Sequence, residues 1–414
     1  MGYVKRDLEE EIKKHIKSRE MIAVVGPRQS GKTTLINNLT KDLKNVNTVS
    51  FDDVKQLKLF EDDVDSFIEL NVKGFDFLFI DEVQYAKDSG RKLKYIHDTQ
   101  KTKVFISGSS SADLSIKSLK YLVGRIFIFK LLPFSFREFL RAKNERLLSL
   151  YETRKYGREI LEQLNKHLQE FILYGGYPRV VLEKTKDGKK TILRNIYSTY
   201  LLREINEITE LSDNDKLINL MKSLSLQTGN IINYNELSNT TGFPYRELKR
   251  YMQILEETYI TKRVTTFHTN KRTELVKSPK IYFYDTGFRN TCIDNYTTDR
   301  TDAGALHENL IFSELAKHDI TPKYWRTKTG AEVDFILEKT PIEVKTKLNN
   351  TKTTRSLQSF IEKYHPKDAY ILSLDHEDKK KTKQTQIKYL PTVKYLPTIT
   401  NTQQNRSLRV CNGT

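Results

Sequence analysis

The sequence predicts an α/β protein of several domains, built around a parallel sheet. Three observations support this fold class. Apolar, strand-like runs alternate with helical stretches over residues 21–130, residues 135–230 are almost wholly helical in pattern, and short strands and helices return from residue 231 onward. Strand–helix alternation is typical of a parallel sheet with helices on both faces. The expected strands of this sheet are 21–25, 47–51, 76–80, 103–107 and 126–130.

A glycine-rich loop follows the first strand, in the stretch VVGPRQSGKTTLINNL. Residues 26–33 fit G-x-x-x-x-G-K-[ST] without a mismatch. The glycines let backbone N–H groups point at phosphate oxygens, Lys32 brings a positive charge to the β- and γ-phosphates, and the Thr33 hydroxyl ligates Mg²⁺. A chance glycine turn is the alternative, but strand, loop and helix all fall where nucleotide binding needs them. The sequence therefore predicts a nucleoside triphosphate site formed by Gly26, Pro27, Arg28, Gln29, Ser30, Gly31, Lys32, Thr33 and Thr34.

Acidic residues end a second apolar run, FDFLFIDEVQ. Asp81 stands where a neighbouring strand would present a carboxylate to the metal, and Glu82 stands where a water-activating base is needed. A strand that simply ends in solvated acids is the alternative interpretation.

Two further residues are candidates for contact with the phosphates. Ser107 lies at the end of the expected strand 103–107 and could contact the γ-phosphate or the attacking water, although serine after a strand is also ordinary loop chemistry. Arg125 follows a glycine at the expected edge of the sheet, in YLVGRIFIF. In ring-forming ATPases an arginine near this position can reach a phosphate in its own subunit or in a neighbour. A surface ion pair is the alternative for Arg125.

The middle of the chain predicts a helical unit followed by a helix-turn-helix. YGGYPRVV interrupts the helical pattern of residues 135–230, which fits either a lid over the nucleotide or a plain helical bundle. Two helices at 236–241 and 245–257 flank a Gly-Phe-Pro turn, and two strands follow, as in a winged helix. The second helix carries Arg246, Lys249 and Arg250 on one side, which favours DNA binding. Docking of a protein partner, or of another part of the same chain, is the alternative.

The C-terminal part contains a set of acidic residues with a lysine. After a helix that bears Glu308, strand alternation in EVDFIL predicts Val333 and Phe335 inside, with Asp334 on the opposite face. A hairpin would bring Asp334 beside Glu343, and Lys345 lies one pleat further on. Two carboxylates that hold Mg²⁺ and a lysine that orients water suit a metal-dependent phosphodiesterase. The spacing fits the PD-(D/E)xK nuclease signature without its leading proline. The alternative is a charged surface hairpin without a catalytic role.

Composition and charge indicate the kind of partner and the compartment to expect for this protein. Lys and Arg exceed Asp and Glu by 70 to 53, a net charge of +17 that favours a polyanionic partner, unless the charge only keeps the surface soluble. The sequence has no run near the ~20 apolar residues of a membrane span and no signal-peptide pattern. The two cysteines lie far apart and predict neither a disulfide nor a metal framework, so we expect a cytoplasmic protein.

Taken together, these segments resemble a widespread archaeal and bacterial family of AAA+-like ATPases with a C-terminal domain of unknown function. The resemblance rests on GPRQSGKTT, FIDEVQ, SGSSS, LVGR, LLPFSFREF, YGGYP, KIYFYDTGFRN, ALHENLIFSEL, YWRTKTGAEVDF and PIEVK, in the family's order over nearly all of residues 1–375. It implies an ATPase core (1–134), a helical lid (135–230), a winged helix (231–295) and a restriction-endonuclease-like domain (296–395), with ATP and Mg²⁺ as ligands. It assigns Lys32, Thr33, Asp81 and Glu82 to the nucleotide site, and Glu308, Asp334, Glu343 and Lys345 to the nuclease-type site. Residues 396–414 are predicted to be a disordered tail.

Two functions fit this sequence. In the first, ATP turnover drives or licenses DNA cleavage by the C-terminal domain. In the second, the nucleotide state controls docking onto DNA or a protein partner, and the nuclease-like domain only binds. The sequence leaves the oligomeric state, the DNA preference and the choice between ATP and GTP open.

Overall fold

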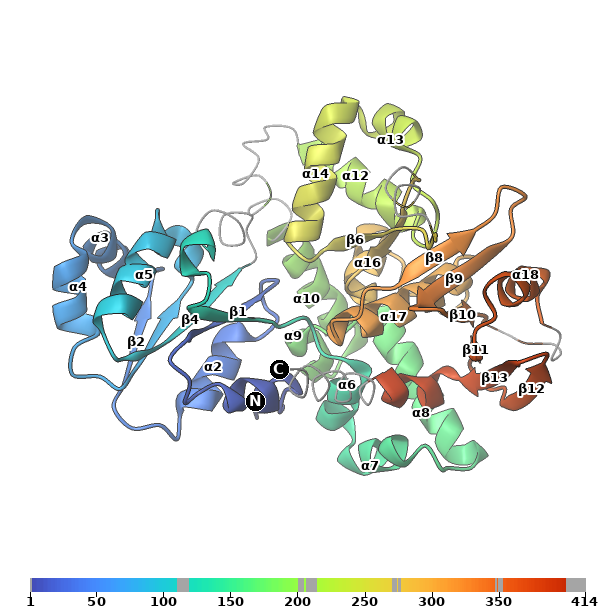
Figure 1. Ribbon diagram of the computed structural model, residues 1–414, viewed down its shortest axis with the longest axis horizontal. Coiled ribbons are helices and arrows are strands. Elements are labelled where there is room, and N and C mark those ends of the chain that lie inside the picture. Colours follow the sequence, from blue (N-terminus) through green and yellow to red (C-terminus); the bar gives the residue numbers. More distant parts are fainter. Residues whose placement is uncertain are drawn as a thin grey trace.

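The computed structural model describes residues 2–109, 119–199, 205, 214–269, 274, 277–346, 348 and 353–399. Two lobes are visible in Figure 1: a sheet-centred N-terminal lobe, and a larger lobe formed by the described residues that follow it. Among the described residues, no helix is both long and apolar enough to cross a bilayer.

The N-terminal lobe is a five-stranded parallel sheet in the order β2-β3-β4-β1-β5. The strands are β1 (Met21–Gly26), β2 (Val46–Ser50), β3 (Phe77–Asp81), β4 (Lys103–Ser109) and β5 (Ile126–Lys130). Its helices are α1 (Leu8–Lys14), α2 (Lys32–Thr40), α3 (Val54–Asp62), α4 (Val64–Asn71) and α5 (Ser89–Thr99), with short 3₁₀ turns at Val83–Tyr85 and Leu119–Leu122. The parallel sheet that the alternating pattern predicts is confirmed, and every expected strand is present.

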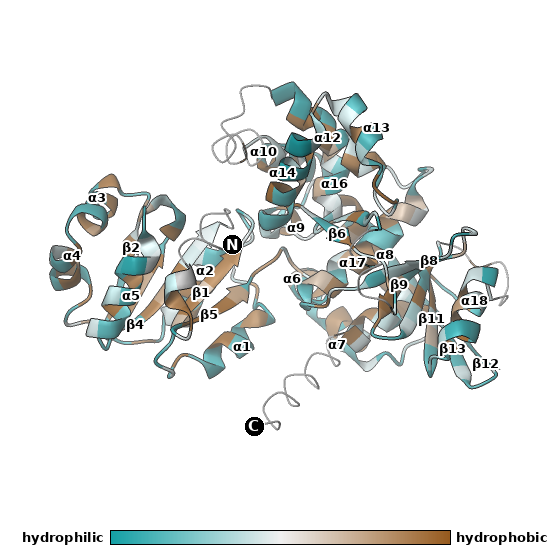
Figure 2. Ribbon diagram, turned by 45° about the horizontal axis from the view of Figure 1, so that its top comes forward, coloured by the Kyte–Doolittle hydropathy of each residue, from teal (hydrophilic) through white to brown (hydrophobic). Residues whose placement is uncertain are grey.

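Helices cover both faces of this sheet because the side chains of the central strand alternate between them. Met21 and Ala23 pack with α3, α4 and α5, whereas Ile22 and Val24 pack with α1 and α2. Figure 2 shows hydrophobic residues concentrated on the strands between these two layers. Gly26 ends β1 where no larger residue fits, since a Cβ there would lie 2.1 Å from the carbonyl oxygen of Leu131.

Helices occupy most of the middle of the chain. They are α6 (Phe136–Lys143), α7 (Glu145–Thr153), α8 (Arg158–Tyr174), α9 (Pro178–Leu182), α10 (Lys186–Thr199) and α12 (Asn214–Leu226). Then come α13 (Tyr234–Thr241), α14 (Tyr245–Glu257), the two-stranded antiparallel sheet of β6 (Thr261–Val264) and β7 (Lys280–Phe283), and α16 (Thr286–Cys292). Asn233 caps α13, and Gly242 ends it in a left-handed conformation, which makes the turn into α14. Two helices followed by a β-hairpin are compatible with the winged-helix interpretation, which stays a prediction.

The C-terminal part is a six-stranded mixed sheet in the order β12-β13-β11-β10-β9-β8. Its elements are α17 (Ala303–Lys317), β8 (Lys323–Arg326), β9 (Glu332–Leu337), β10 (Thr340–Val344), α18 (Arg355–Tyr364), β11 (Asp368–Ser373), β12 (Asp378–Thr382) and β13 (Thr385–Pro391). Strands β8, β9 and β10 run antiparallel, and β11 lies parallel to β10. One face of the sheet packs with α17 and the other with α18.

A bulge in β9 changes the expected alternation. Lys323 pairs with Ile336 and Trp325 pairs with Val333, so two steps on β8 match three on β9. As a result Val333 packs on the α18 side and Phe335 on the α17 side, and the prediction that they share one face is wrong. The extra residue lies at Asp334 or Phe335, which re-aims the Asp334 side chain.

The helical middle and the C-terminal sheet share one hydrophobic core. Phe136, Phe139 and Leu168 belong to the same buried cluster as Leu310 and Ile342. The helices α6–α8 therefore pack with the C-terminal sheet. A second core joins α10, α12, α13, α14 and α16.

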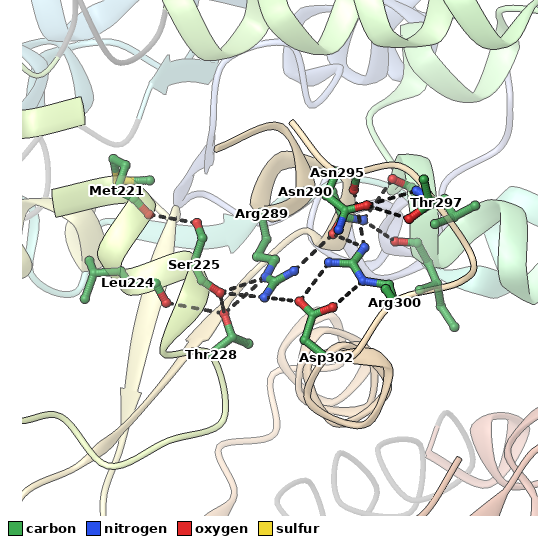
Figure 3. A network of polar contacts seen from close by, with 12 residues as sticks. Met221, Leu224, Ser225, Thr228, Arg289, Asn290, Asn295, Thr297, Arg300 and Asp302 are labelled. Atoms are coloured by element: carbon green, nitrogen blue, oxygen red, sulfur yellow. Dashed lines mark hydrogen bonds and ion pairs between the residues drawn. The ribbon is translucent and has the colours of Figure 1, made fainter. Parts of the chain in front are cut away.

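A buried arginine network fixes the start of α17 (Figure 3). Arg289 is fully buried, donates to the carbonyl oxygen of Ser225 and lies 2.6 Å from a carboxylate oxygen of Asp302. Arg300 pairs with the other side of Asp302, which directly precedes α17. The network ties α12 and α16 to the helix that carries Glu308.

The predicted disordered tail begins too early. Residues 392–399 are helical, and Leu396 and Ile399 are buried in the shared core. The prediction of disorder is wrong for 396–399, because Val393, Leu396 and Ile399 recur at a helical spacing of three. Residues 400–414 lie outside the described residues.

Candidate functional site

The glycine-rich loop joins β1 to α2, as its sequence predicts. Gly31 has a left-handed backbone (φ 94°) directly before Lys32, the first residue of α2. The Lys32 ammonium is buried and donates to the carbonyl oxygens of Gly26 and Pro27, both at 3.0 Å, so it lies across the loop. The Ser30 hydroxyl is buried with no hydrogen-bond partner. A buried polar group without a partner is costly, and a phosphate oxygen would supply one.

A carboxylate from β3 meets the start of α2. The Thr33 hydroxyl donates to Oδ2 of Asp81 at 2.8 Å, and Ser107 on β4 donates to Oδ1 of the same carboxylate. Because β4 lies between β1 and β3, the carboxyl ends of three strands converge here. Hydroxyl and carboxylate oxygens are the ligands that Mg²⁺ prefers, so Thr33 and Asp81 fit this ion.

Glu82 follows Asp81 in a left-handed conformation (φ 56°), which turns the chain out of the sheet. Its carboxylate accepts a hydrogen bond from the side chain of Gln84, which in turn accepts from the backbone N–H of Ser109 at 3.2 Å. Glu82 is thus positioned by two strands. Arg28 reaches the hydroxyl of Tyr85 at 3.0 Å, whereas Gln29 and Thr34 are exposed.

Arg125 is not at this site within the chain. Its backbone carbonyl accepts from Met21 at the amino end of β1, whereas the loop follows the carboxyl end. Five residues of strand, at about 3.3 Å each, separate the two ends by roughly 16 Å. Arg125 instead pairs with Asp98 (Nε–Oδ1 2.7 Å), so its predicted contact with nucleotide in the same chain is wrong and the ion-pair alternative describes its position. A contact in a neighbouring subunit stays a prediction.

Arg6, which the sequence analysis did not identify, contacts the nucleotide-binding loop. Arg6 is buried and donates to the carbonyl oxygens of Ser30 (2.8 Å) and Leu132 (2.6 Å). It also pairs with Glu138, whose carboxylate closes the capping box of α6. No local motif marks an arginine whose partners lie 24 to 132 positions away.

The YGGYP segment lies beside the loop. A Cβ built on Gly31 would be 3.8 Å from Cγ of Pro178, at the start of α9. Gly176 accepts a hydrogen bond from Phe134 (2.7 Å), and its own N–H donates to Asp285 at 2.7 Å. The segment is therefore fixed between the N-terminal lobe and α16.

The C-terminal acidic residues gather around a buried lysine that the sequence interpretation did not single out. Lys280 on β7 is 1% exposed and lies 3.0 Å from Glu308 and 2.7 Å from Glu332. The hydroxyl of Tyr282 donates to the same oxygen of Glu308. Burial acts to lower the pKa of Lys280, but the carboxylates of Glu308, Asp334 and Glu332 outweigh it and raise this pKa. The only sequence signal was a lysine in the otherwise apolar strand KIYF.

Asp334 and Glu343 come together near Lys345, as the hairpin predicts. Oδ2 of Asp334 accepts from the backbone N–H of Val344 at 2.8 Å, and Oε1 of Glu343 accepts from Thr354 at 2.6 Å. Burial raises the pKa of Glu343 to about 7, while Lys345 acts to lower it. Oε2 of Glu343 is buried without a partner, which fits a cation at this carboxylate. Nevertheless, among the residues that the structure describes, no three His, Cys, Asp or Glu side chains are arranged to hold a metal.

The basic face of α14 is open. Arg246, Lys249 and Arg250 are exposed, and Lys249 lies over the ring of Tyr245 at 4.5 Å. The opposite face is buried through Tyr251, Ile254 and Leu255.

The strand order, the loop and the Thr33–Asp81 pair define a P-loop ATPase domain. Residues 18–140 match the family described as AAA domain, so this part of the chain is an AAA-type, ATP-binding domain. Residues 165–299 and 303–395 match two domains of unknown function, DUF8612 and DUF4143.

Relatives match this chain over most of its length. An uncharacterized protein of Methanocaldococcus jannaschii is 26% identical over 81% of this chain and 77% of its own length. One from Haemophilus influenzae is 25% identical over 78% of this chain and 81% of its own length. Among solved structures, a Walker-type ATPase of Pyrococcus abyssi aligns with 70% of this chain and 96% of its own at a TM-score of 0.44 and 13% identity.

Proposed function

We propose that the chain is an ATPase whose nucleotide state controls the action of its C-terminal half on DNA. The observation that carries the ATPase part is the Thr33–Asp81–Ser107 set, which lies next to Lys32 and Glu82. Thr33 and Asp81 would hold Mg²⁺, which supplies charge neutralisation at the phosphates. Lys32 would exchange its two carbonyl partners for phosphate oxygens. Glu82, positioned by Gln84, would accept a proton from the attacking water.

A line of buried contacts supports coupling between the two halves. Arg6 joins the carbonyl of Ser30 in the loop to Glu138 on α6. The backbone N–H of Phe136 at the start of α6 donates to Glu314 at 3.0 Å. Glu314 lies on α17, the helix that carries Glu308. A movement of the loop on ATP binding would therefore be transmitted through these contacts to α17.

DNA is the partner that the charge favours. The net charge is +17, and the basic face of α14 is exposed. Phosphate contacts by such a face would give sequence-independent, salt-sensitive binding. In the C-terminal half, the paired Asp334 and Glu343, with Lys345 beside them, favour metal-dependent cleavage.

One observation favours the second function, in which the C-terminal domain binds but does not cut. Oε1 of Glu308 is paired with both Lys280 and Tyr282, so this oxygen already has partners. On this view ATP controls docking of α14 and the C-terminal sheet, and no phosphodiester bond is broken.

Cleavage assays separate the two functions. Labelled single-stranded, duplex and branched DNA would be incubated with Mg²⁺ or Mn²⁺, with and without ATP, for wild type, Asp334→Asn and Lys32→Ala. Cleavage that is lost in Asp334→Asn and altered in Lys32→Ala supports the coupled nuclease. ATP hydrolysis without cleavage of any substrate supports the switch. Absence of ATP hydrolysis in wild type would refute both.

A further inference from the structure

The acidic site of the C-terminal half, formed by Glu308, Glu332, Asp334 and Glu343, already contains a positively charged side chain. The Lys280 ammonium lies 3.0 Å from Glu308 and 2.7 Å from Glu332, and Asp334 is a third carboxylate that acts on its charge. Lys280 comes from β7, outside the sheet that carries Glu332 and Asp334. An element of the preceding domain therefore supplies the charge that compensates this site.

The arrangement differs from an ordinary structural ion pair in its charge balance. One buried ammonium faces three carboxylates, with Glu343 close to Asp334. Two other cations lie near this group: Lys345 acts on Asp334 and Glu343, and the half-exposed Arg326 lies 3.5 Å from Glu332. Buried carboxylates without compensation are strongly unfavourable. If Lys280 leaves, the group must take up protons or another cation.

The surroundings hold Lys280 in place. Its backbone pairs with Val264 in the β6–β7 sheet, and a bridge joins it to Ile231. Tyr282 lies two residues further along β7, and its hydroxyl donates to Glu308. Lys280 and Tyr282, on the same face of β7, therefore contact the same carboxylate. The contact with Glu308 is thus built into the hairpin that follows α14.

We propose that Lys280 is a built-in counter-cation that keeps the acidic site closed, so that Lys280 and a divalent metal compete for Glu308, Glu332 and Asp334. This inference rests on the proposed metal-dependent function of the C-terminal half and adds its regulation. The site binds metal weakly while β7 is docked, and it binds metal well when Lys280 is withdrawn. Because β7 belongs to the hairpin that follows the basic helix α14, a partner that binds α14 and displaces this hairpin would open the site.

The test compares metal affinity in full-length variants. Mn²⁺ binding would be measured by calorimetry without nucleotide, in a Thr33→Ala background so that the P-loop contributes little. Lys280→Met keeps most of the length of the side chain and removes its charge. We expect its Mn²⁺ affinity to exceed that of the Lys280 parent by about tenfold or more, the size of effect that groups around metal ligands produce. The gain should disappear in Lys280→Met/Asp334→Asn.

The other outcomes are equally decisive. Equal affinity in the parent and Lys280→Met, with both lost on Asp334→Asn, would overturn the counter-cation while leaving the proposed metal site intact. Absence of Asp334-dependent Mn²⁺ binding in both chains would refute the metal site itself, and the inference with it.

A second variant protects the test if Lys280→Met does not fold. Lys280→Gln also removes the charge and keeps a polar group that can donate to Glu308. It should show the same gain in Mn²⁺ affinity, again lost on Asp334→Asn, and an affinity equal to that of the parent would overturn the inference.

Discussion

The guanidinium of Arg6 lies 2.9 Å from the carboxylate of Glu138, although 132 positions separate the two residues. Both side chains are almost fully buried, and the same guanidinium reaches the carbonyl of Ser30 in the nucleotide-binding loop. One ion pair thus joins the N-terminal segment, the loop and the first helix after the sheet.

Arg6→Ala should destabilise the protein strongly. The change leaves the Glu138 carboxylate buried without its cation, and breaking a buried pair typically costs about 3–5 kcal/mol. Denaturant unfolding of the N-terminal lobe would measure the loss. Arg158→Ala is the matched control, because Arg158 makes an exposed pair with Glu162 and its removal should change stability by less than about 0.5 kcal/mol. Comparable losses in the two variants would contradict the role of Arg6.

Glu82→Gln should bind ATP but hydrolyse it at least about a hundredfold more slowly. The amide keeps the size and the contact with Gln84 but cannot accept a proton, and general bases contribute about 10²–10⁴ in rate. Phosphate release and equilibrium nucleotide binding would be measured in parallel, with Lys32→Ala as the control that loses binding. Normal turnover in Glu82→Gln would remove Glu82 from this role.

Asn309→Leu should destabilise the larger lobe by roughly 2–4 kcal/mol. The buried Asn309 amide accepts from Phe283 N–H at 2.7 Å and donates to its carbonyl oxygen at 3.1 Å, so leucine would leave both backbone groups unsatisfied. Thermal unfolding would show the effect. Asn195→Leu, on the exposed side of α10, should change little, and an equal effect there would refute the explanation.

The lowered pKa of Lys103 predicts that the free energy of unfolding increases at alkaline pH. Burial lowers the pKa of Lys103 to about 8 from its ordinary value of 10.5. Between these two values the unfolded chain binds more protons than the folded chain, so the free energy of unfolding increases with pH. We expect wild type to gain stability relative to Lys103→Met as pH rises from 8 toward 10. The exposed Lys101 is the control: Lys101→Met should track wild type over this range, and a pH-independent difference for Lys103→Met would contradict the prediction.

Removing the positive charges on the basic face of α14 should lower the affinity for DNA by the same factor whatever the DNA sequence. Arg246→Ala/Lys249→Ala/Arg250→Ala should lower the slope of log affinity against log salt by about 2–3, since each phosphate contact contributes about 0.9. Fluorescence anisotropy over a salt series would measure it. Lys55→Ala/Lys58→Ala on the exposed side of α3 is the control. An unchanged slope in the triple variant would direct the search to a protein partner.

The sequence predicts those features whose signals are local. The loop at 26–33, the five parallel strands and the pairing of Asp334 with Glu343 all depend on neighbours within a few residues or one hairpin. Arg6 and Lys280 could not be found in this way, because their partners lie far along the chain and nothing in their own segments requires a buried charge. The bulge in β9 was also hidden, since Glu332–Phe335 alternate polar and apolar, and only the pairing with β8 reveals the extra residue. Arg125 was misplaced because its distance from a glycine says nothing about which end of the strand it occupies.

The core that α6–α8 share with the C-terminal sheet limits how this protein can be divided. A fragment that ends near residue 295 would expose Phe136, Phe139 and Leu168, while a fragment that begins there would lack the helices that cover Leu310 and Ile342. Neither piece should be soluble alone, even though each boundary looks natural in the sequence. Gene fusions, truncations and isolated-domain assays should therefore keep the helices α6–α8 together with the C-terminal sheet, and a cut between the two lobes near residue 131 would still break the buried Arg6–Glu138 pair.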